Sequence, residues 1–227
     1  MNAKKIAAEK AVEYIEPGMV IGLGTGSTAA FTIQKTGEMV RQGLDVHAVA
    51  SSLQSEDLAK QAGIPLIGFE NMERIDLSID GADEVDDNGN LLKGGGGALL
   101  REKILAFNSK QFIVVTDESK RVNTLGKFNL AVEIIPFARE LTMKRLEELG
   151  TNPILRQRGN QNFISDNGNL VVDCNFYPIT DPAALNAMLH LIPGVVETGL
   201  FSNHLVHKII IGYHDGSVLE FDTTQTG

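Results

Sequence analysis

The chain has 227 residues, 43% of them hydrophobic, and a formal net charge of −9. This acidic balance argues against binding to nucleic acid, because neutralising backbone phosphates needs clustered cations. The only cysteine, Cys174, excludes an intramolecular disulfide and a multi-cysteine metal site, and it fits a reducing cytosol. We therefore expect a cytoplasmic protein with one large α/β domain, or with one medium and one small domain.

The first predicted element is an amphipathic helix that ends where Pro17 and Gly18 interrupt its period. Glu9, Lys10 and Glu13 lie among its apolar residues, so it lacks the unbroken apolar core of a signal peptide. No window of the sequence approaches the roughly eighteen apolar residues that a membrane-spanning helix needs. We therefore expect no association with a membrane.

The next part of the chain alternates short apolar strands with helices. Strands are expected at residues 19–23, 46–50, 64–67, 75–79 and 112–115, and helices after the GTGST turn and at residues 56–62 and 99–107. This alternation predicts a parallel sheet with helices on both faces. Ligands of such sheets bind beyond the carboxyl ends of the strands, where the GTGST and DGAD motifs both lie.

The pattern changes after about residue 128. Strands are expected at residues 131–135, 153–156, 170–173 and 195–200, and helices at residues 137–149 and 182–191, the second capped by Asp181. This order, βαββαβ, is the ferredoxin-like arrangement. A hairpin at residues 208–212 and 217–221 turns at Asp215–Gly216 and is expected to return to the first domain. The sequence thus predicts a Rossmann-like parallel-sheet domain at residues 1–128 plus 203–227, with a small ferredoxin-like α+β domain at 129–202 inserted in it.

The GTGST motif at residues 24–28 follows the first strand and opens a helix. Its spacing matches neither the dinucleotide fingerprint nor the P-loop lysine motif. Glycines would let backbone N–H groups approach an anion, and Ser27 and Thr28 would add hydroxyl donors at a helix N-terminus. An ordinary strand-to-helix turn with a Ser or Thr cap explains the motif equally well. No acidic residue follows where the ribose of NAD would need one, so a dinucleotide is disfavoured.

The IDGADEVD segment at residues 79–86 crowds carboxylates after an apolar run. Asp80 closes that strand and should be partly buried, so it needs a partner, and Lys93 is the nearest cation in the sequence. Asp80 and Asp83 suit either a functional pair or a solvated turn, while the spacing of a calcium-binding EF-hand loop is missing. The acids expected to belong to a solvated turn are Glu84, Asp86 and Asp87.

The KGGGG motif at residues 93–97 removes side chains directly before a helix. Such a run favours the close approach of another group or backbone conformations with positive φ. Leu100, Ile104 and Phe107 have the spacing of a core stripe on the following helix. Glu102 would then lie on the other face, where a solvated residue is the simpler interpretation. The glycines below it favour the alternative, a face open to a ligand.

The remaining polar residues give weaker signals. The five histidines lack a metal-ligand spacing with carboxylates, and no nucleophile elbow occurs, so we expect no metal site and no Ser or Cys nucleophile. Lys4 and Lys120 are ordinary surface lysines unless folding brings them near the GTGST turn. Lys120 follows the strand at residues 112–115 at the end where a ligand would bind.

Several motifs follow one another along the chain: GLGTGSTA at 22–29, IDGADEVD at 79–86, KGGGGALLREKI at 93–104, TDESK at 116–120, LGKF at 125–128, DNGN at 166–169 and IPGVVETGLF at 192–201. As an ordered set they resemble the type A family of ribose-5-phosphate isomerases. The resemblance covers nearly the whole chain, although residues 31–75 add little to it. It implies reversible conversion of D-ribose 5-phosphate to D-ribulose 5-phosphate in the pentose phosphate pathway. It also implies a homodimer or homotetramer that uses neither a metal nor an organic cofactor.

The resemblance further implies roles for individual residues. Glu102 would be the general base that moves a proton from C2 to C1 through a cis-enediolate, and Lys93 with the N–H groups of Gly94–Gly96 would hold the oxyanion. Asp80 would assist ring opening and would bind sugar hydroxyls together with Asp83. The substrate contacts that it implies are Lys4, Thr25, Gly26, Ser27, Thr28, Asp80, Gly81, Ala82, Asp83, Lys93, Gly94, Gly95, Gly96 and Lys120.

Two other classes of protein are weighed against this one. A sugar-phosphate sensor of the kind found in DeoR-type regulators would need a DNA-binding segment, and the acidic chain shows no helix-turn-helix. A CoA-transferase-like enzyme would use a Glu nucleophile, but the chain is small and offers no place for an adenine. Both expectations are therefore weaker than the isomerase.

Overall fold

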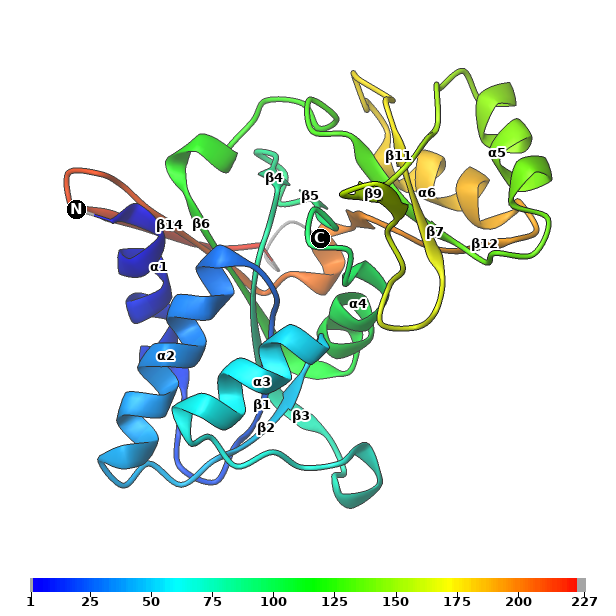
Figure 1. Ribbon diagram of the computed structural model, residues 1–227. Coiled ribbons are helices and arrows are strands. Elements are labelled where there is room, and N and C mark those ends of the chain that lie inside the picture. The colour runs from blue at the N-terminus through cyan, green and yellow to red at the C-terminus, as the bar shows by residue number, and fades with distance from the viewer. Residues whose placement is uncertain (1, 224–227) are drawn as a thin grey trace. The chain divides into compact units, whose positions relative to one another are not determined.

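The computed structural model describes residues 2–223, which form two compact units (Figure 1). Unit 1 comprises the chain up to Ala82, Arg101–Lys120 and the chain from Asn203, and unit 2 comprises Asp83–Leu100 and Arg121–Ser202. The predicted first domain also included residues 83–100 and 121–128, which group here with unit 2. The predicted domain boundaries stay a prediction, and residues 1 and 224–227 of that domain lie outside the described residues.

Unit 1 is built on a six-stranded sheet. In spatial order its strands are β15 (Val218–Asp222), β14 (Lys208–Gly212), β6 (Ser109–Asp117), β3 (Ile75–Gly81), β1 (Val20–Leu23) and β2 (His47–Ala50). All neighbouring strands are parallel except β15, which pairs antiparallel with β14 in the predicted hairpin. The predicted parallel α/β sheet is therefore confirmed. The strand expected at residues 64–67 is reduced to a single bridge between Leu66 and Ala48.

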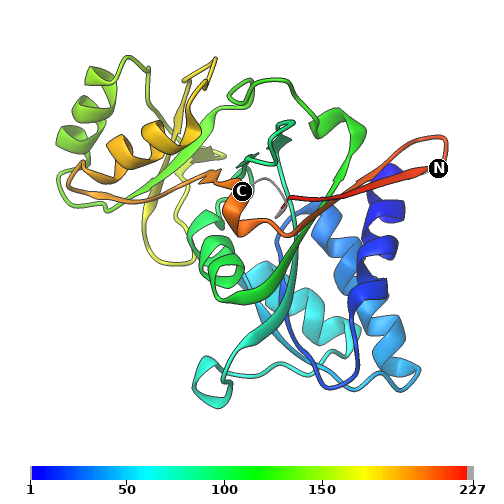
Figure 2. The ribbon, with the colours of Figure 1, turned by 180° about the vertical axis from the view of Figure 1, so that it is seen from behind.

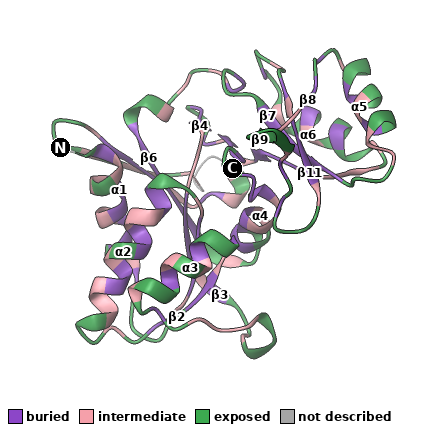
Figure 3. Cartoon of the chain, viewed as in Figure 1, coloured by how far each residue is buried: buried purple, intermediate pink, exposed green. Residues whose placement is uncertain are grey.

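Helices cover the unit 1 sheet. They are α1 (Ala3–Ala11), α2 (Ser27–Arg41), α3 (Leu53–Ala62) and α4 (Leu99–Phe107), the last of which begins in unit 2. Figures 1 and 2 show α1, α2 and α3 along one face, and Figure 3 shows buried residues along the strands beneath them. Helix α3 ends as predicted at Gly63, which adopts the left-handed conformation with φ 77°. One-turn 3-10 helices occur at Val12–Tyr14, Phe69–Asn71, Glu118–Lys120 and Asn203–Leu205.

The strand order places a topological switch point between β1 and β3. Strand β1 lies between β2 and β3, so the chain leaves β1 toward one edge of the sheet and returns on its other side. Open α/β sheets of this order bind ligands in the crevice outside the carboxyl ends of the two strands at such a point. The GTGST motif follows β1 and the DGAD motif ends β3. Both motifs therefore lie at the switch point.

Helix α4 buries a different face from the one predicted. Leu99, Glu102 and Leu105 are buried, whereas Ile104 and Phe107 are 45% and 72% exposed. The predicted core stripe, which contained the last two residues, is wrong. Both faces have helical spacing, and the choice is made by neighbours distant in sequence, because Leu105 packs in one apolar cluster with Val49 and Ile75.

Unit 2 contains a four-stranded antiparallel sheet. Its spatial order is β12 (Val195–Thr198), β7 (Leu130–Ile134), β11 (Leu170–Cys174) and β8 (Ile154–Leu155), with α5 (Arg139–Glu148) after β7 and α6 (Pro182–His190) after β11. The predicted βαββαβ order is present, with the short hairpin β9 (Gln157–Arg158) and β10 (Gln161–Asn162) added between β8 and β11. Asp181 caps α6 as predicted, because its side chain accepts the N–H of Ala184.

A second, smaller sheet of unit 2 explains why residues 83–100 belong there. Strands β4 (Glu84–Val85) and β5 (Leu91–Leu92) pair with each other, and β5 also pairs with β13 (Leu200–Phe201). The strand predicted at residues 195–200 is thus divided between two sheets. Cys174 is fully buried in the larger one, and burial raises the pKa of its thiol to about 12. Among the residues that the structure describes, no helix is long and apolar enough to cross a membrane.

Candidate functional site

The GTGST turn presents a helix N-terminus in unit 1. Gly26 has φ 105°, which a residue with a side chain rarely adopts, and α2 begins directly after it at Ser27. The first N–H groups of a helix have no partner within the helix, and they favour an anion. Gly26 and Ser27 are exposed, and Thr28 is 9% exposed. The turn therefore offers backbone and hydroxyl donors beside solvent.

The sequence left open whether Lys4 and Lys120 lie near this turn. The structure connects Lys4 to it directly and Lys120 through Asp117. Lys4 on α1 donates from Nζ to Ser27 Oγ at 3.0 Å. Lys120 ends the 3-10 turn that follows β6, whose last residue is Asp117. Burial raises the pKa of Asp117, but hydrogen bonds from Ser119 and the charges of Lys4 and Lys120 outweigh it, so the net shift is downward. Both lysines thus act electrostatically on one buried carboxylate beside the GTGST helix.

Asp80 is part of the same turn. It is 3% exposed, and its Oδ1 accepts the N–H of Thr25 at 3.0 Å and that of Gly81 at 2.7 Å. A Cβ atom at Gly24 would lie 2.0 Å from this oxygen, so only glycine leaves room for the carboxylate. The position of a Cβ at Gly81 is 3.8 Å from Thr28 Cβ, so the DGAD and GTGST motifs adjoin. Burial of Asp80 agrees with its predicted position at the strand end.

Three serines that the sequence did not single out support the turn from below. Thr25 Oγ1 lies 2.7 Å from Ser51 Oγ, donates to Ser52 Oγ at 2.8 Å and lies 3.2 Å from Ser55 Oγ. Ser55 also donates to the carbonyl of Gly24 at 2.6 Å. All three serines are buried. They lie in the SSLQSE segment at the carboxyl end of β2, which is not one of the motifs that carry the resemblance.

Unit 2 holds Asp83, Lys93 and the Gly94–Gly96 run in a second glycine turn. Lys93 is 3% exposed, and its ammonium lies 5.5 Å from the centroid of the Phe201 ring. Asp83 is half-buried, and its Oδ2 accepts the N–H of Gly95 at 2.8 Å. Gly95 and Gly96 are exposed, whereas Gly94 is buried. The structure therefore groups Asp83 and Lys93 with the glycines predicted to hold an oxyanion, and one of those N–H groups already has a carboxylate acceptor.

Glycine is required at both ends of this turn. Gly94 has φ 103° and Gly97 has φ 78°. A Cβ at Gly94 would lie 2.8 Å from Ala131 Cβ, and a Cβ at Gly97 would lie 2.3 Å from Phe163 Cζ. The predicted reasons for the run, positive φ and close approach, are both confirmed.

Two acids assigned to a solvated turn are buried instead. Glu84 is 4% exposed and accepts the N–H groups of Gly126 and Phe128, each at 2.6 Å. Asp86 is 7% exposed and accepts the N–H groups of Asn88 and Asn90 across its turn. Those expectations were wrong because backbone donors supplied by folding replace water around a carboxylate. The third acid, Asp87, is exposed as predicted.

Glu102 lies on the buried face of α4 and is 5% exposed. The interpretation of Glu102 as a solvated surface residue is therefore wrong. A carboxylate is rarely buried to this extent unless other groups compensate it. Ala82, the last of the predicted contacts, is half-buried directly after β3.

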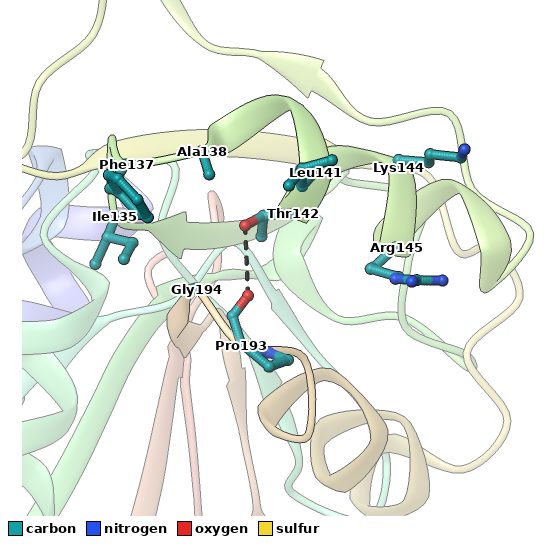
Figure 4. Close-up of a pocket in the computed structure, with 9 residues that line it drawn as sticks. All are labelled: Ile135, Phe137, Ala138, Leu141, Thr142, Lys144, Arg145, Pro193 and Gly194. Atoms are coloured by element: carbon teal, nitrogen blue, oxygen red, sulfur yellow. Dashed lines mark hydrogen bonds between the residues drawn. The ribbon is translucent and has the colours of Figure 1, made fainter.

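A surface pocket of about 420 Å³ in unit 2 contains none of the predicted residues (Figure 4). Ile135, Phe137 and Leu141 supply apolar side chains, and Thr142 Oγ1 donates to the carbonyl of Pro193 at 3.4 Å. Its charged lining residues are Lys144 and Arg145. Within residues 2–223, no group of three or more His, Cys, Asp or Glu side chains could hold a metal ion.

Comparison with known proteins gives the same family for the sequence profile and for the curated relatives described next. The sequence profile of "Ribose 5-phosphate isomerase A (phosphoriboisomerase A)" matches residues 47–216. The chain is 50% identical to ribose-5-phosphate isomerase A of Bacillus mycoides over 95% of this chain and 98% of that one. It is 46% identical to the Picrophilus torridus protein of the same name, over 95% of each chain.

Two solved structures agree with the sequence matches. Ribose 5-phosphate isomerase A of Methanocaldococcus jannaschii superposes with a TM-score of 0.91 at 38% identity, covering 96% of this chain and 97% of that one. A D-ribose-5-phosphate isomerase in complex with phospho-erythronic acid superposes with a TM-score of 0.93 at 39% identity, covering 98% and 100%. The chain belongs to the ribose 5-phosphate isomerase A family.

Proposed function

We propose that this protein interconverts D-ribose 5-phosphate and D-ribulose 5-phosphate through a cis-enediolate, a reaction of the non-oxidative pentose phosphate pathway. The observation that carries the proposal is the similarity, over the whole length of that chain, to an isomerase that binds phospho-erythronic acid. That compound combines a phosphate with a carboxylate. A carboxylate resembles an enediolate in its two negatively charged oxygens, so a site that binds it suits an enediolate intermediate.

The GTGST turn is the proposed phosphate site. Its support is the N-terminus of α2, the hydroxyls of Ser27 and Thr28, and the Lys4 ammonium 3.0 Å from Ser27 Oγ. Lys120 adds a second cation, which acts electrostatically on Asp117 together with Lys4. Phosphate oxygens would replace solvent at these donors. The remote phosphate would then fix the sugar for reaction at C1 and C2.

The second glycine turn is proposed to stabilise charge during the reaction. Lys93 and the N–H groups of Gly94–Gly96 would hold the oxygen on which negative charge develops. Asp83 would bind a sugar hydroxyl, as would Asp80, whose Oδ1 already holds two N–H groups. Asp80 is also proposed to assist opening of the furanose ring. Gly81 and Ala82 carry the chain between these two carboxylates.

Glu102 is the proposed general base. It would take the proton from C2 of the open-chain aldose while the C1 carbonyl oxygen gains the negative charge, and it would return that proton to C1. The hydroxyl proton of O2 is transferred to O1 as the C2 carbonyl forms, so that O1 ends as a hydroxyl and atoms and charge balance without a cofactor. Burial of Glu102 supports this role, because a base screened from water does not exchange its proton freely with solvent.

The direct test is an isomerase assay of the wild type and of Glu102→Gln. The wild type should form ribulose 5-phosphate at the same rate with and without EDTA. Glu102→Gln should lower kcat by about 10²- to 10⁴-fold, the usual contribution of a positioned base, with the thermal midpoint nearly unchanged. Near-normal turnover by Glu102→Gln would remove the base assignment. Loss of wild-type activity in EDTA would indicate a metal.

The assembly is proposed to be a homodimer or homotetramer in the cytoplasm. Exposed apolar side chains in unit 2 support an assembly, because Phe137 and Leu141 are 83% and 68% exposed. Sedimentation equilibrium should give two or four times the chain mass of 24.5 kDa. A concentration-independent monomer would overturn this part of the proposal.

A further inference from the structure

Arg156 donates hydrogen bonds to the carbonyl groups of the second glycine turn. The residue lies between β8 and β9, and its backbone is fixed because its N–H donates to Val171 and its carbonyl accepts from Phe163. Its guanidinium Nη1 donates to the carbonyl of Gly94 at 2.6 Å and to that of Gly95 at 3.3 Å. Two consecutive peptide groups of the turn are therefore held by one charged side chain.

The guanidinium is itself held from behind. Arg156 Nε donates to Asp173 Oδ2 at 3.0 Å, and Nη2 donates to the other oxygen of the same carboxylate. This two-point pairing fixes the plane of the guanidinium as well as its position. The side chains of Arg156 and Asp173 are 13% and 23% exposed, so water screens the pair little. Asp173 is on β11, in the centre of the antiparallel sheet.

Because each peptide group is planar, fixing its carbonyl also fixes the N–H group on the other side of the turn. In a trans peptide the carbonyl of one residue and the N–H of the next point in opposite directions. Holding the carbonyl of Gly94 therefore fixes the N–H of Gly95, and holding that of Gly95 fixes the N–H of Gly96. The positive charge of the Arg156 guanidinium, which contacts both carbonyls, also polarises the two peptides and strengthens their N–H groups as donors.

The far end of the turn is blocked by the same neighbourhood. Phe163 is 8% exposed, and its ring leaves no room for a side chain at Gly97. The Arg156 guanidinium lies 5.9 Å from the centroid of that ring. The turn thus lies between the Arg156 guanidinium and the Phe163 ring. Rotating its peptides would break the hydrogen bonds from Arg156 or bring the turn into collision with the ring. We call the Arg156–Asp173 pair and its two carbonyl contacts the clamp.

We infer that Arg156, anchored by Asp173, is a positioning residue of the reaction: it fixes and polarises the Gly95 N–H, which holds the Asp83 carboxylate, and the Gly96 N–H. The inference rests on the proposed function, in which Asp83 binds a sugar hydroxyl and the Gly96 N–H faces the developing oxyanion. Arg156 does not touch the substrate in this scheme. Lysine cannot replace it, because one ammonium lacks the planar fork that reaches two carbonyls and a carboxylate together.

The test compares Arg156→Lys and Arg156→Gln with Arg158→Gln as the matched control. Arg158 lies 4.8 Å from the same Phe163 ring but is exposed on β9 and has no role in the clamp. We expect kcat to fall about 10-fold in Arg156→Lys and about 10²-fold in Arg156→Gln, the scale of a misplaced or lost oxyanion donor. KM should change less than about threefold, since the phosphate site is untouched. Arg158→Gln should match the wild type.

A binding measurement separates positioning from simple loss of stability. Calorimetric affinity for phospho-erythronic acid should weaken in proportion to kcat/KM in both Arg156 variants, while affinity for inorganic phosphate stays constant. Asp173→Asn should give a smaller loss, and combining it with Arg156→Gln should add little, because the two residues act as one unit. A lower thermal midpoint with unchanged kcat and unchanged affinity for the acid would overturn the inference.

The outcomes also separate this inference from the proposed function. A wild-type protein that does not isomerise ribose 5-phosphate overturns the proposed function and the inference together. A wild-type isomerase whose Arg156→Gln variant is equally active overturns the clamp alone. Equal losses in the Arg156 and Arg158 variants would also overturn it, because the effect would then follow from Phe163 packing and not from the carbonyl contacts.

Discussion

The two glycine turns each hold a carboxylate of the DGAD motif, but different side chains support them. Each turn gives one N–H group to a carboxylate of the DGAD motif, Thr25 to Asp80 and Gly95 to Asp83. Each also contains a glycine whose Cβ would strike that same carboxylate, at 2.0 Å for Gly24 and 2.7 Å for Gly95. Two carboxylates three residues apart thus organise two turns, one in each compact unit.

The turns differ in what supports them from behind. Neutral hydroxyls support the first, since Ser55 donates to the Gly24 carbonyl and to no other carbonyl of that turn. A charged guanidinium supports the second and holds two carbonyls. Hydrogen bonds from charged donors contribute about 1.5–3 kcal/mol, against about 0.5–1.5 kcal/mol for neutral ones. The second turn is therefore the more strongly fixed, as expected if it meets charge that exists only during the reaction.

Among these variants, Lys93→Ala in the second turn should cause the largest fall in kcat. If the second turn stabilises the oxyanion, kcat should fall by about 10²- to 10³-fold with little change in KM. Lys127→Ala is the control, since Lys127 is exposed in the same unit. Steady-state kinetics measures both parameters, and the thermal midpoint detects damage to the fold, because Lys93 is buried. A raised KM with unchanged kcat would show that Lys93 binds the substrate and does not stabilise the oxyanion.

Alanine at the two carboxylate-facing glycines should separate the turns next. Gly24 and Asp80 are both buried, so Gly24→Ala must displace the carboxylate and should lower kcat/KM by about 10²-fold, with about 1–3 kcal/mol of overpacking strain. Gly95 is exposed and Asp83 is half-buried, so Asp83 can move aside and Gly95→Ala should cost about 10-fold or less. Kinetics and thermal melts measure both, and the reverse order would contradict the comparison.

The sequence predicted most strands of the two larger sheets and both glycine turns, because short apolar runs and glycine motifs are local signals. It did not predict which face of α4 is buried, because Leu105 finds its neighbours in β2 and β3, far away in sequence. That error is why a solvated Glu102 was the simpler interpretation of the helix alone. The contacts of Glu84 with the LGKF segment were missed for the same reason, since both N–H donors lie more than forty residues from the carboxylate.

Some support was invisible for a different reason. Arg156 and the three serines match no motif, because a residue that contacts backbone atoms leaves no constraint on its partner's side chain. Their carbonyl acceptors are available in every peptide, so only the folded geometry selects them. Gly97 was the nearest sequence signal, and the wall that it faces, Phe163, follows much later in the chain.

Lys120→Ala tests the first turn as a phosphate site. KM should rise about 10-fold while kcat stays within about twofold, because the charge meets the phosphate equally in substrate and transition state. Inhibition by inorganic phosphate should weaken by the same factor, and added salt should reduce the difference. Lys60→Ala is a suitable control, since Lys60 is exposed on α3 in the same unit. An unchanged KM would take Lys120 out of the phosphate site.

Ser55→Ala should give the smallest effect and test the hydroxyl support directly. The variant removes one neutral donor to the Gly24 carbonyl, about 1 kcal/mol, so KM should rise about fivefold with kcat unchanged. The charged support of the second turn should cost more when it is removed, and in kcat instead of KM. Thermal melts of both variants check that neither effect is unfolding. If Ser55→Ala lowered kcat as strongly as Arg156→Gln, the two turns would share one task, because a neutral donor and a charged donor would then limit the same step.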